Sequence, residues 1–454
     1  MNLDDTIVAI ATAPGRGGIG VVRLAGPEAK RIVSPMLRLK HDLESGRSVF
    51  AELIEPEAPH DQRIDEVVVT YFAKPHSYTT DDIVEISAHG SPVVLRHIVE
   101  LALARGARLA EPGEFTMRAF LNGRIDLTQA EAVRDLIDSQ TLYQAKVAAQ
   151  QLGGALSHRL QPIKQKLVEL IAILEAGIDF AEDDISVLPA DQILQRIAAV
   201  GAPLEDLASS FAYGKLVREG LTLAIVGRPN VGKSSLFNCL VERERAIVTA
   251  TPGTTRDLVS ETVAIGGIPV RLVDTAGIRR AVDEAESIGI RKSMEALADA
   301  DLVLIVLDSS QPMEDEDAEL LRQVGQRPCI AVENKWDITS PNFSARSSPL
   351  PRVQTSATTD HGIPELRNEI LKQAGGEAAT QIETGFLTNL RHRERVRESL
   401  AALAAARTAL ADKVPHEMLL LDLYSALRPL DEITGATTTD DILNLIFSTF
   451  CIGK

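Results

Sequence analysis

The sequence predicts a multidomain protein: an N-terminal α/β domain, then an all-α helical domain interrupted by a second α/β domain. Three observations support this fold class. Short β-type runs such as "DTIVAIATA" and "GIGVVRLAG", separated by a glycine-rich turn, occur within residues 1–118. Helical apolar periodicity dominates 119–216 and returns in 377–454. Between these blocks, in 217–376, strand and helix patterns alternate, which is typical of a parallel sheet.

The order of these patterns defines four expected segments. They are the N-terminal domain at 1–118, the first part of the helical domain at 119–216, the inserted domain at 217–376, and the second helical part at 377–454. Thr128 and Glu131 have the spacing of a capping box, which predicts a helix start there. Independent domains in a row remain an alternative. Insertion is favoured because surface loops tolerate inserted domains.

Composition places the chain among ordinary globular proteins of the cell interior. Of its 454 residues, 45% are apolar and 24% charged, and no apolar run reaches the roughly 18 residues that span a bilayer. The start, "MNLDDTIVAI", carries acids where a signal peptide has basic residues. Cys239, Cys329 and Cys451 show no pairing pattern, which favours a reducing cytoplasm. The net charge of −17 argues against a protein that wraps nucleic acid over its whole surface.

A phosphate-binding loop opens the inserted domain. "LTLAIVGRPNVGKSSLFNCLV" places Gly227, Gly232, Lys233 and Ser234 between a buried-strand pattern and a helix pattern. Glycines let backbone N–H groups face phosphate oxygens, and the helix N-terminus adds a favourable dipole. Lys233 can neutralise the β- and γ-phosphates, and the Ser234 hydroxyl can hold Mg²⁺. The loop predicts nucleotide triphosphate binding.

Three further motifs each follow a strand pattern: Asp274-Thr275-Ala276-Gly277, Asn334-Lys335-Trp336-Asp337 and Ser356-Ala357-Thr358. The first puts a carboxylate near the Mg²⁺ shell. Asp337 can accept the N1–H and 2-amino N–H of guanine, whereas adenine offers neither donor and would leave the carboxylate unpaired. In this order the motifs predict a GTP site on a Ras-like P-loop GTPase domain. The expected nucleotide contacts are Asn230, Val231, Gly232, Lys233, Ser234, Ser235, Thr249, Ala250, Thr251, Pro252, Gly253, Thr254, Thr255, Asp274, Thr275, Ala276, Gly277, Asn334, Lys335, Asp337, Ser356, Ala357 and Thr358.

The residues expected to catalyse GTP hydrolysis differ from those of Ras-type enzymes. "AIVTATPGTTRDLV" has the composition of a switch loop, and Thr255 is the expected second hydroxyl ligand of Mg²⁺. Ras-type enzymes place a water-orienting Gln directly after this DTAG motif, but Ile278 stands there and cannot polarise water. Acids and arginines of "GIRRAVDEAESIG" are candidates, with a solvated helix start as the alternative. Asn230 can help bind a monovalent cation, which would supply the charge of an arginine finger.

Together the GTPase motifs, "GTTRD", the "PGRGGIG" start, "EPGEFTMRAFLNGRIDLTQAEAV" and the terminal "FCIGK" resemble the MnmE (TrmE) family of tRNA-modification GTPases. The resemblance covers essentially the whole chain. It implies a cytoplasmic homodimer with a folate-binding N-terminal domain and a G domain inserted in the helical domain. It also implies that K⁺-dependent GTP hydrolysis drives 5-carboxymethylaminomethyl-type modification of the wobble uridine (U34) in certain tRNAs. An FAD-dependent partner, MnmG (GidA), and a tetrahydrofolate one-carbon donor (5,10-methylene- or 5-formyl-) act with it, with partner and chain forming a heterotetramer.

The resemblance also implies roles for particular residues. Glu286 would orient the attacking water that Ile278 cannot, Arg279 would order the switch region, and Lys233 would complete the catalytic group. The implied K⁺ ligands are Asn230, Thr249, Thr251 and Thr254, the implied Mg²⁺ ligands are Ser234 and Thr255, and the implied folate contacts are Arg23, Glu85, Arg124 and Lys454. Position 124 often carries Lys in the family, and Arg keeps the charge but not the shape.

The C-terminal "FCIGK" allows several interpretations. Prenylation is disfavoured because Gly453 and Lys454 do not match the lipidation pattern. The resemblance instead implies that this peptide forms a wall of the folate pocket. Cys451 is then either a reactive thiol, which would need a lowered pKa, or a small apolar wall residue, and the second is favoured.

One rival function stays open. A GTP-switched ribosome-assembly or RNA-binding protein of the Era or EngA type would share the GTP motifs. Such proteins carry a basic RNA-binding module or a second G domain, and the sequence predicts neither here.

Overall fold

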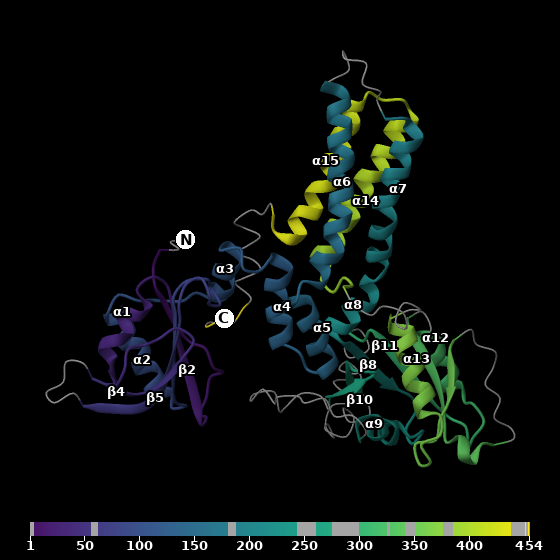
Figure 1. Ribbon diagram of the computed structural model, residues 1–454. Coiled ribbons are helices and arrows are strands. Elements are labelled where there is room, and N and C mark those ends of the chain that lie inside the picture. The colour runs from purple at the N-terminus through teal and green to yellow at the C-terminus, as the bar shows by residue number, and fades with distance from the viewer. Residues whose placement is uncertain are drawn as a thin grey trace. The chain divides into compact units, whose positions relative to one another are not determined.

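A computed structural model describes residues 4–55, 62–179, 188–242, 260–274, 299–324, 327–340, 350–375 and 385–436, with 450 and 453. At 179, 242, 260 and 274 it describes only the backbone. The chain divides into two compact units, Met1–Arg134 with Asp431–Lys454, and Asp135–Leu430 (Figure 1).

The first unit is built on a seven-stranded sheet in the order β3-β4-β5-β6-β2-β1-β7, antiparallel except for the parallel β1–β7 pair. Its strands are β1 (Ile7–Ile10), β2 (Ile19–Ala25), β3 (Leu37–Leu39), β4 (Ser48–Ile54), β5 (Arg63–Phe72), β6 (Ile83–His89) and β7 (Arg108–Leu109). Its helical elements are α1 (Ala29–Val33), η1 (Ser34–Met36), α2 (Pro92–Ala104) and α3 (Glu114–Leu121), followed by α4 (Leu127–Ile137), which reaches into the next unit.

Helix α2 packs on strands β6, β2, β1 and β7 of this sheet. Leu95 and Ile98 of α2 belong to the same buried cluster as Val22 and Leu24 of β2. The approach is close at Gly20, where an added Cβ would lie 2.3 Å from a Leu95 methyl. This packing leaves the side chains that alternate with Val22 and Leu24 along β2, Arg23 among them, on the other face of the sheet.

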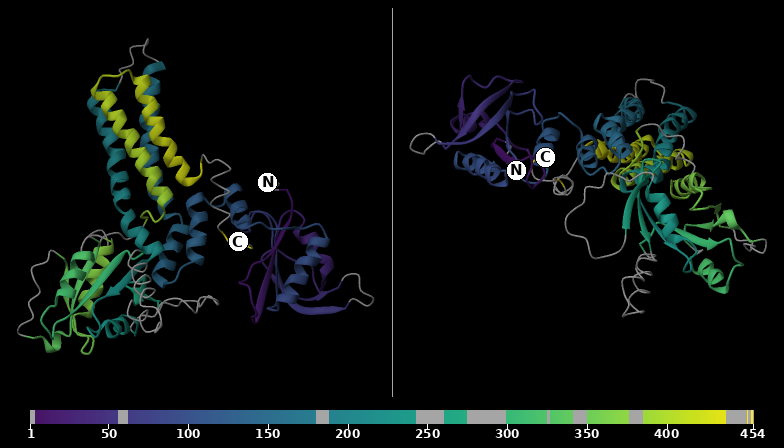
Figure 2. Two further views of the ribbon diagram at one scale, coloured as in Figure 1. Left: turned by 180° about the vertical axis from the view of Figure 1, so that it is seen from behind. Right: turned by 90° about the horizontal axis from the view of Figure 1, so that it is seen from below.

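Long helices dominate one part of the second unit. In both Figure 1 and Figure 2, α6, α7, α14 and α15 run side by side as a bundle. The helices here are α5 (Leu142–Leu152), α6 (Ala155–Asp179), α7 (Ala190–Ser209), α8 (Phe211–Glu219), α14 (Leu390–Ala411) and α15 (His416–Thr434). Helices α7 and α14 pack together although nearly 200 residues separate them in the sequence, so the chain leaves the helical region and returns to it.

The rest of the second unit is a six-stranded sheet in the order β13-β12-β11-β8-β10-β9. All neighbours are parallel except β9 and β10, which form an antiparallel edge hairpin. Its elements are β8 (Leu221–Val226), α9 (Lys233–Glu242), β9 (Ser260–Ile265), β10 (Ile268–Asp274), β11 (Leu302–Asp308), α12 (Asp315–Val324), β12 (Cys329–Asn334), η3 (Trp336–Ile338), β13 (Arg352–Gln354) and α13 (Ile363–Gly375). Every residue of β11 and β12 is buried, because apolar clusters cover both faces of the sheet.

The predicted fold class is confirmed: an α/β N-terminal part, a helical part and an α/β part within it. One local prediction is wrong. The capping box of α4 is made by Asp126 and Gln129, not by Thr128 and Glu131, since the side chains of Asp126 and Gln129 each accept the other's backbone N–H at 2.9 Å. Thr128 instead lies buried within α4 and donates its hydroxyl to Asp126.

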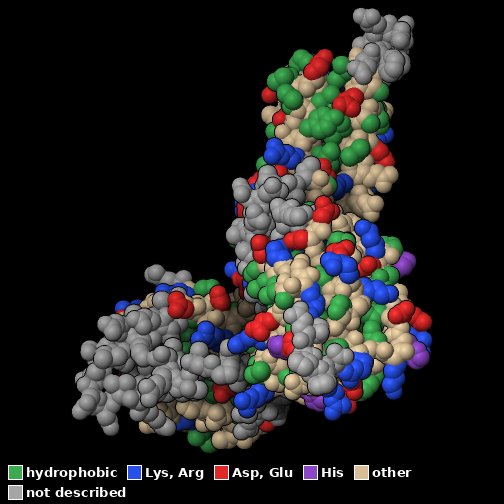
Figure 3. Space-filling model, turned by 90° about the vertical axis from the view of Figure 1, so that its left-hand side faces the viewer, with side chains coloured by type: hydrophobic (Ala, Val, Ile, Leu, Met, Phe, Trp, Pro, Cys, Tyr) green, Lys and Arg blue, Asp and Glu red, His purple; other side chains and the backbone are tan. Residues whose placement is uncertain are grey.

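Figure 3 shows hydrophobic side chains on the surface near the end of the helical bundle. The exposed large hydrophobic residues of the bundle helices include Val168, Ile173, Leu194, Met418, Leu421 and Tyr424. Among the described residues, no helix is both long and apolar enough to cross a bilayer.

Candidate functional site

The phosphate loop connects the buried strand β8 to α9, as the motif requires. Three of its residues adopt positive φ: Gly227 (152°), Asn230 (64°) and Gly232 (99°). The glycines are also needed for space, because a Cβ at Gly227 would lie 2.4 Å from the Val306 carbonyl oxygen. The resulting loop exposes the side chains of Asn230, Ser234 and Ser235.

Lys233 begins α9, and its ammonium group is held by the loop itself. Nζ donates to the carbonyl oxygens of Gly227 at 2.9 Å and Arg228 at 2.6 Å. The side chain is largely buried, so the cation is fixed at the mouth of the loop. A cation at the N-terminus of a helix, over a turn of backbone N–H groups, is an arrangement that attracts phosphate.

The predicted guanine motif lies against this loop. Asn334 ends β12 and donates its Nδ2 to the Val231 carbonyl oxygen at 2.9 Å. Thr355 donates to Asn334 Oδ1 at 3.3 Å, and the backbone N–H of Trp336 donates to the Thr355 carbonyl oxygen at 3.0 Å. The Asn334–Asp337 turn, the end of β13 and the phosphate loop are therefore joined by hydrogen bonds.

Asp337 lies at the open side of this turn. Hydrogen bonding from Ser356 outweighs slight desolvation and lowers the pKa of the Asp337 carboxyl, so it is ionised at neutral pH. An ionised carboxylate held beside Ser356 and Thr358 can accept two N–H donors from a base. The structure thus brings together Asp337, Ser356 and Thr358 as the sequence predicts.

One member of this site was missed. Asp308, at the carboxyl end of β11, accepts Nζ of Lys335 at 2.6 Å and the backbone N–H of Ser310 at 2.9 Å. Burial alone would raise the pKa of Asp308, but the contacts with Lys335 and Ser310 outweigh it and lower the pKa. The sequence signal for Asp308 was a carboxylate directly after the wholly apolar run 302–307, and Asp274 likewise ends β10.

Several predicted residues fall outside the described part of the chain. Asp274 is described only as the last residue of β10. The others outside the described residues are Thr249, Ala250, Thr251, Pro252, Gly253, Thr254, Thr255, Thr275, Ala276, Gly277, Ile278, Arg279, Glu286, Cys451 and Lys454.

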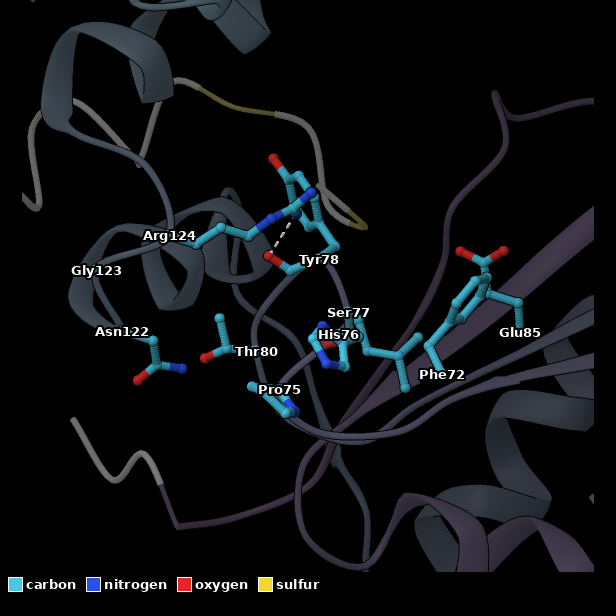
Figure 4. Close-up of a pocket in the computed structure, with 11 residues that line it drawn as sticks. Phe72, Pro75, His76, Ser77, Tyr78, Thr80, Glu85, Asn122, Gly123 and Arg124 are labelled. Carbon is cyan, nitrogen blue, oxygen red and sulfur yellow. Dashed lines mark hydrogen bonds between the residues drawn. The ribbon is translucent and has the colours of Figure 1, made fainter. Parts of the chain in front are cut away.

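A second candidate site lies in the first unit, where the loop after β5 and the turn after α3 enclose a cavity of about 590 Å³ (Figure 4). Its lining includes Phe72, His76, Tyr78, Ile83, Glu85, Asn122 and Arg124. Two of the residues predicted to contact folate, Glu85 and Arg124, belong to this lining. Arg23 does not line the cavity but contacts Glu85.

Arg23 and Glu85 face each other across the antiparallel β2–β6 pair. Arg23 Nε and Nη2 lie 2.8 and 2.7 Å from the same oxygen, Glu85 Oε1. Within the described residues, Glu85 Oε2 has no such partner, so this oxygen is available to accept donors from a ligand. At the other end of the cavity, Arg124 is exposed and donates Nη1 to the Tyr78 carbonyl oxygen at 2.8 Å.

A buried ionic network fixes α3, the helix that leads to Arg124. Glu114 and Arg118 are fully buried and contact each other at 2.8 Å. Arg108 reaches Glu114 at 2.6 Å, and Arg118 also donates to Asp5. Burial would raise the pKa of Glu114, but hydrogen bonds from Arg108, the Glu111 amide and Arg118 outweigh it and lower the pKa. This network accounts for the two charged residues, Glu114 and Arg118, of the "GEFTMRAFLN" segment.

Two described residues near the C-terminus, Phe450 and Gly453, belong to the same unit. Gly453 is buried with φ of 100°, and an added Cβ would lie 2.4 Å from the Ile10 carbonyl oxygen. Ile10 pairs with Val22, the neighbour of Arg23 on β2. Phe450 is also buried.

A mostly parallel sheet carrying a strand–loop–helix phosphate site and an Asn-Lys-Trp-Asp turn defines a P-loop GTPase. The family models "GTP-binding protein TrmE N-terminus" and "MnmE helical domain" match residues 6–124 and 127–451. The chain belongs to the MnmE (TrmE) family of tRNA modification GTPases.

Curated relatives are similar in sequence to this chain over its full length. The tRNA modification GTPase MnmE of Koribacter versatilis is 69% identical, with 100% of both chains covered. Those of Aquifex aeolicus and Geobacter sulfurreducens are 43% and 42% identical, with 99% and 100% of this chain and 100% of each relative covered. Among solved structures, the G domain of the T. maritima FeoB iron transporter is 27% identical over 34% of this chain and 98% of its own, with a TM-score of 0.27.

Proposed function

We propose that this GTPase hydrolyses GTP to drive 5-carboxymethylaminomethyl-type modification of wobble uridine U34 in certain tRNAs. The observation that carries the GTPase half is the Asn334–Val231 hydrogen bond, which joins the base-reading turn to the phosphate loop. A single nucleotide can then contact both. Asp337 accepts the guanine donors, and purified protein should bind GTP and not ATP.

Two kinds of metal ion serve this site. Ser234, exposed at the first turn of α9, would hold Mg²⁺ together with Thr255. Asn230, whose side chain is exposed at a left-handed position of the loop, would hold K⁺ together with Thr249, Thr251 and Thr254. These residue types offer the hydroxyl and amide oxygens that hard cations prefer. Bound K⁺ supplies positive charge beside the phosphates.

Catalysis of hydrolysis is assigned to Glu286, Arg279 and Lys233. Lys233 neutralises phosphate charge, Glu286 orients the attacking water, and Arg279 orders the switch region. Glu286→Ala should slow turnover while leaving GTP affinity nearly intact.

The K⁺ assignment has a direct test. GTP turnover should rise markedly in KCl relative to NaCl, and Asn230→Ala should lose this stimulation selectively. Equal rates of the native protein in both salts would contradict the assignment.

The cavity of the first unit is the proposed folate site. Glu85 Oε2 suits the N–H donors of a pterin, and Arg23 and Arg124 suit its carbonyl or the glutamyl carboxylates. From the resemblance, Lys454 is proposed as a further folate contact; Lys454 and Cys451 both lie outside the described residues. Cys451 is proposed as a wall residue, with a covalent role tested by Cys451→Ser.

We further propose a cytoplasmic homodimer that forms a heterotetramer with an FAD-dependent MnmG (GidA)-type partner and acts on tRNA. The proposed domains are 1–118, 119–216 with 377–454, and the inserted G domain at 217–376. Equilibrium dialysis with 5-formyltetrahydrofolate tests the folate half. Absence of binding would favour the alternative, a ribosome-assembly GTPase of the Era or EngA type.

A further inference from the structure

Tyr78 contacts Arg124, which lines the cavity, and Arg23, which contacts the lining residue Glu85; no motif in the sequence pointed to Tyr78. The guanidinium carbon of Arg124 lies 5.0 Å from the centre of the Tyr78 ring, and that of Arg23 lies 5.8 Å from it. Figure 4 shows the Arg124 side chain against the Tyr78 ring at one end of the cavity. Guanidinium groups over aromatic faces are attracted by the ring quadrupole, so one ring restrains both cations.

Tyr78 is itself held at two points, the ring hydroxyl and the backbone carbonyl. Its hydroxyl lies 2.9 Å from Thr116 Oγ1, on the helix α3 that the buried Glu114–Arg118 pair fixes. Its backbone carbonyl accepts Arg124 Nη1. Burial raises the pKa of the Tyr78 phenol, so the hydroxyl keeps its proton at neutral pH. A ring whose hydroxyl is anchored on α3 can set the position of the side chains that pack on it.

The restraint on Arg23 has a consequence for Glu85. The Arg23 guanidinium also lies 5.6 Å from the Phe115 ring centre, and both of its contacting nitrogens reach Glu85 Oε1. Those two contacts occupy one carboxylate oxygen. They leave Oε2, which has no such partner in the described ranges, as the acceptor that the cavity presents. Arg124, exposed and with only one donor used in the described contacts, offers its remaining N–H groups at the opposite end.

We infer that Tyr78 is the positioning residue of this cavity. It holds Arg23 so that Glu85 Oε2 receives the N–H donors of a flat heterocycle, and it holds Arg124 to receive the anionic tail of the same ligand. The inference rests on the proposed folate function and names the residue that couples the two ends of the site.

The test compares full-length Tyr78→Leu and Tyr78→Phe with native protein by calorimetric titration of 5-formyltetrahydrofolate and of tetrahydropterin, which lacks the glutamyl tail. Tyr78→Leu loses both cation–π contacts, so its affinity for 5-formyltetrahydrofolate should fall by about tenfold or more. Tyr78→Phe keeps the ring and loses only the Thr116 contact, so the loss should be about threefold. The affinity for tetrahydropterin should fall less than that for 5-formyltetrahydrofolate, because tetrahydropterin has no glutamyl tail to contact Arg124.

Tyr71→Leu is the matched control. Tyr71 lies in the same sheet and makes a similar contact, 5.1 Å from Lys30 Nζ to the ring centre, but it does not line the cavity. Folate affinity should be unchanged in this variant. GTP turnover should be unchanged in all of them.

A second measurement needs no ligand. With arginine-selective ¹⁵N labelling, the Nε–H of Arg23 should exchange slowly with water in native protein and Tyr78→Phe, and rapidly in Tyr78→Leu. If native protein binds no folate, the folate function fails while this signal still tests Tyr78. Native affinity together with a protected Arg23 signal in Tyr78→Leu would overturn the inference. If Tyr78→Leu does not fold, undiminished affinity in both Tyr78→Phe and Thr116→Val would overturn it instead.

Discussion

The nucleotide site and the cavity of the first unit each have a cation held in place beside them, but the cations are held differently. Lys233 is held by carbonyl groups five and six residues earlier in its own loop. Arg23 is held by Glu85 from another strand and by the rings of Tyr78 and Phe115 from two further segments. The first arrangement is local in the sequence, and the second exists only after the sheet and α3 have formed.

This difference has a physical consequence. A local loop tolerates change elsewhere, because backbone geometry and two glycines define it. A cavity assembled from distant side chains depends on the structure that supports them, here the ionic network around Glu114 and Arg118.

Lys233→Ala should abolish measurable GTP turnover, a loss of about 100-fold or more, because the cation that faces the phosphates is removed. Folate binding should be unaffected. Turnover and equilibrium dialysis on one preparation measure both, and a parallel loss of folate binding would show that the two sites are not independent.

Glu114→Gln should destabilise the first unit by about 3 kcal/mol, because it leaves the buried Arg118 without its full partner. Since the folded pKa of Glu114 lies below its ordinary value of 4.5, the native carboxylate stabilises the fold above about pH 4.5. That stabilisation is lost as the pH falls through the folded pKa. Thermal melts from pH 7 to pH 3 should therefore converge for native protein and variant at the acid end. A constant difference at every pH would contradict this role.

Glu85→Gln should weaken 5-formyltetrahydrofolate by about tenfold, since a neutral amide accepts less strongly and Arg23 loses its ion pair. Glu52→Gln, in the same sheet but away from the cavity, is the control. Equal affinities of native protein and Glu85→Gln would remove Glu85 from the site.

Asp308→Asn should weaken the binding of GDP by about threefold, because Lys335 loses a charged partner. The carboxylate of Asp337, which is proposed to bind the base, stays in place. In Asp308→Asn the affinities for GDP and IDP should fall by the same factor. In Asp337→Asn the ratio of these two affinities should change. The comparison needs only fluorescent-nucleotide competition. A changed ratio in Asp308→Asn would mean that Asp308 acts on base recognition itself.

The sequence alone identified the phosphate loop, the guanine motif and the alternation of strands and helices, because these depend on neighbours along the chain. It also placed Glu85 and Arg124 through resemblance. It missed Asp308, which pairs with Lys335 27 residues away, and Tyr78, which contacts Thr116 38 residues away. It misplaced the cap of α4 because Thr128–Glu131 and Asp126–Gln129 have equal spacing. Only side-chain geometry distinguishes the two.

The local sequence therefore determined that this protein binds a nucleotide, since the conformation of a glycine-rich turn between a strand and a helix depends on the residues of the turn itself. The tertiary structure decided which side chains surround the cavity of the first unit. Antiparallel pairing set Arg23 opposite Glu85, and the buried network set α3 so that Thr116 meets Tyr78. Contacts between segments distant in the chain form only when burial compensates the entropy lost in bringing those segments together.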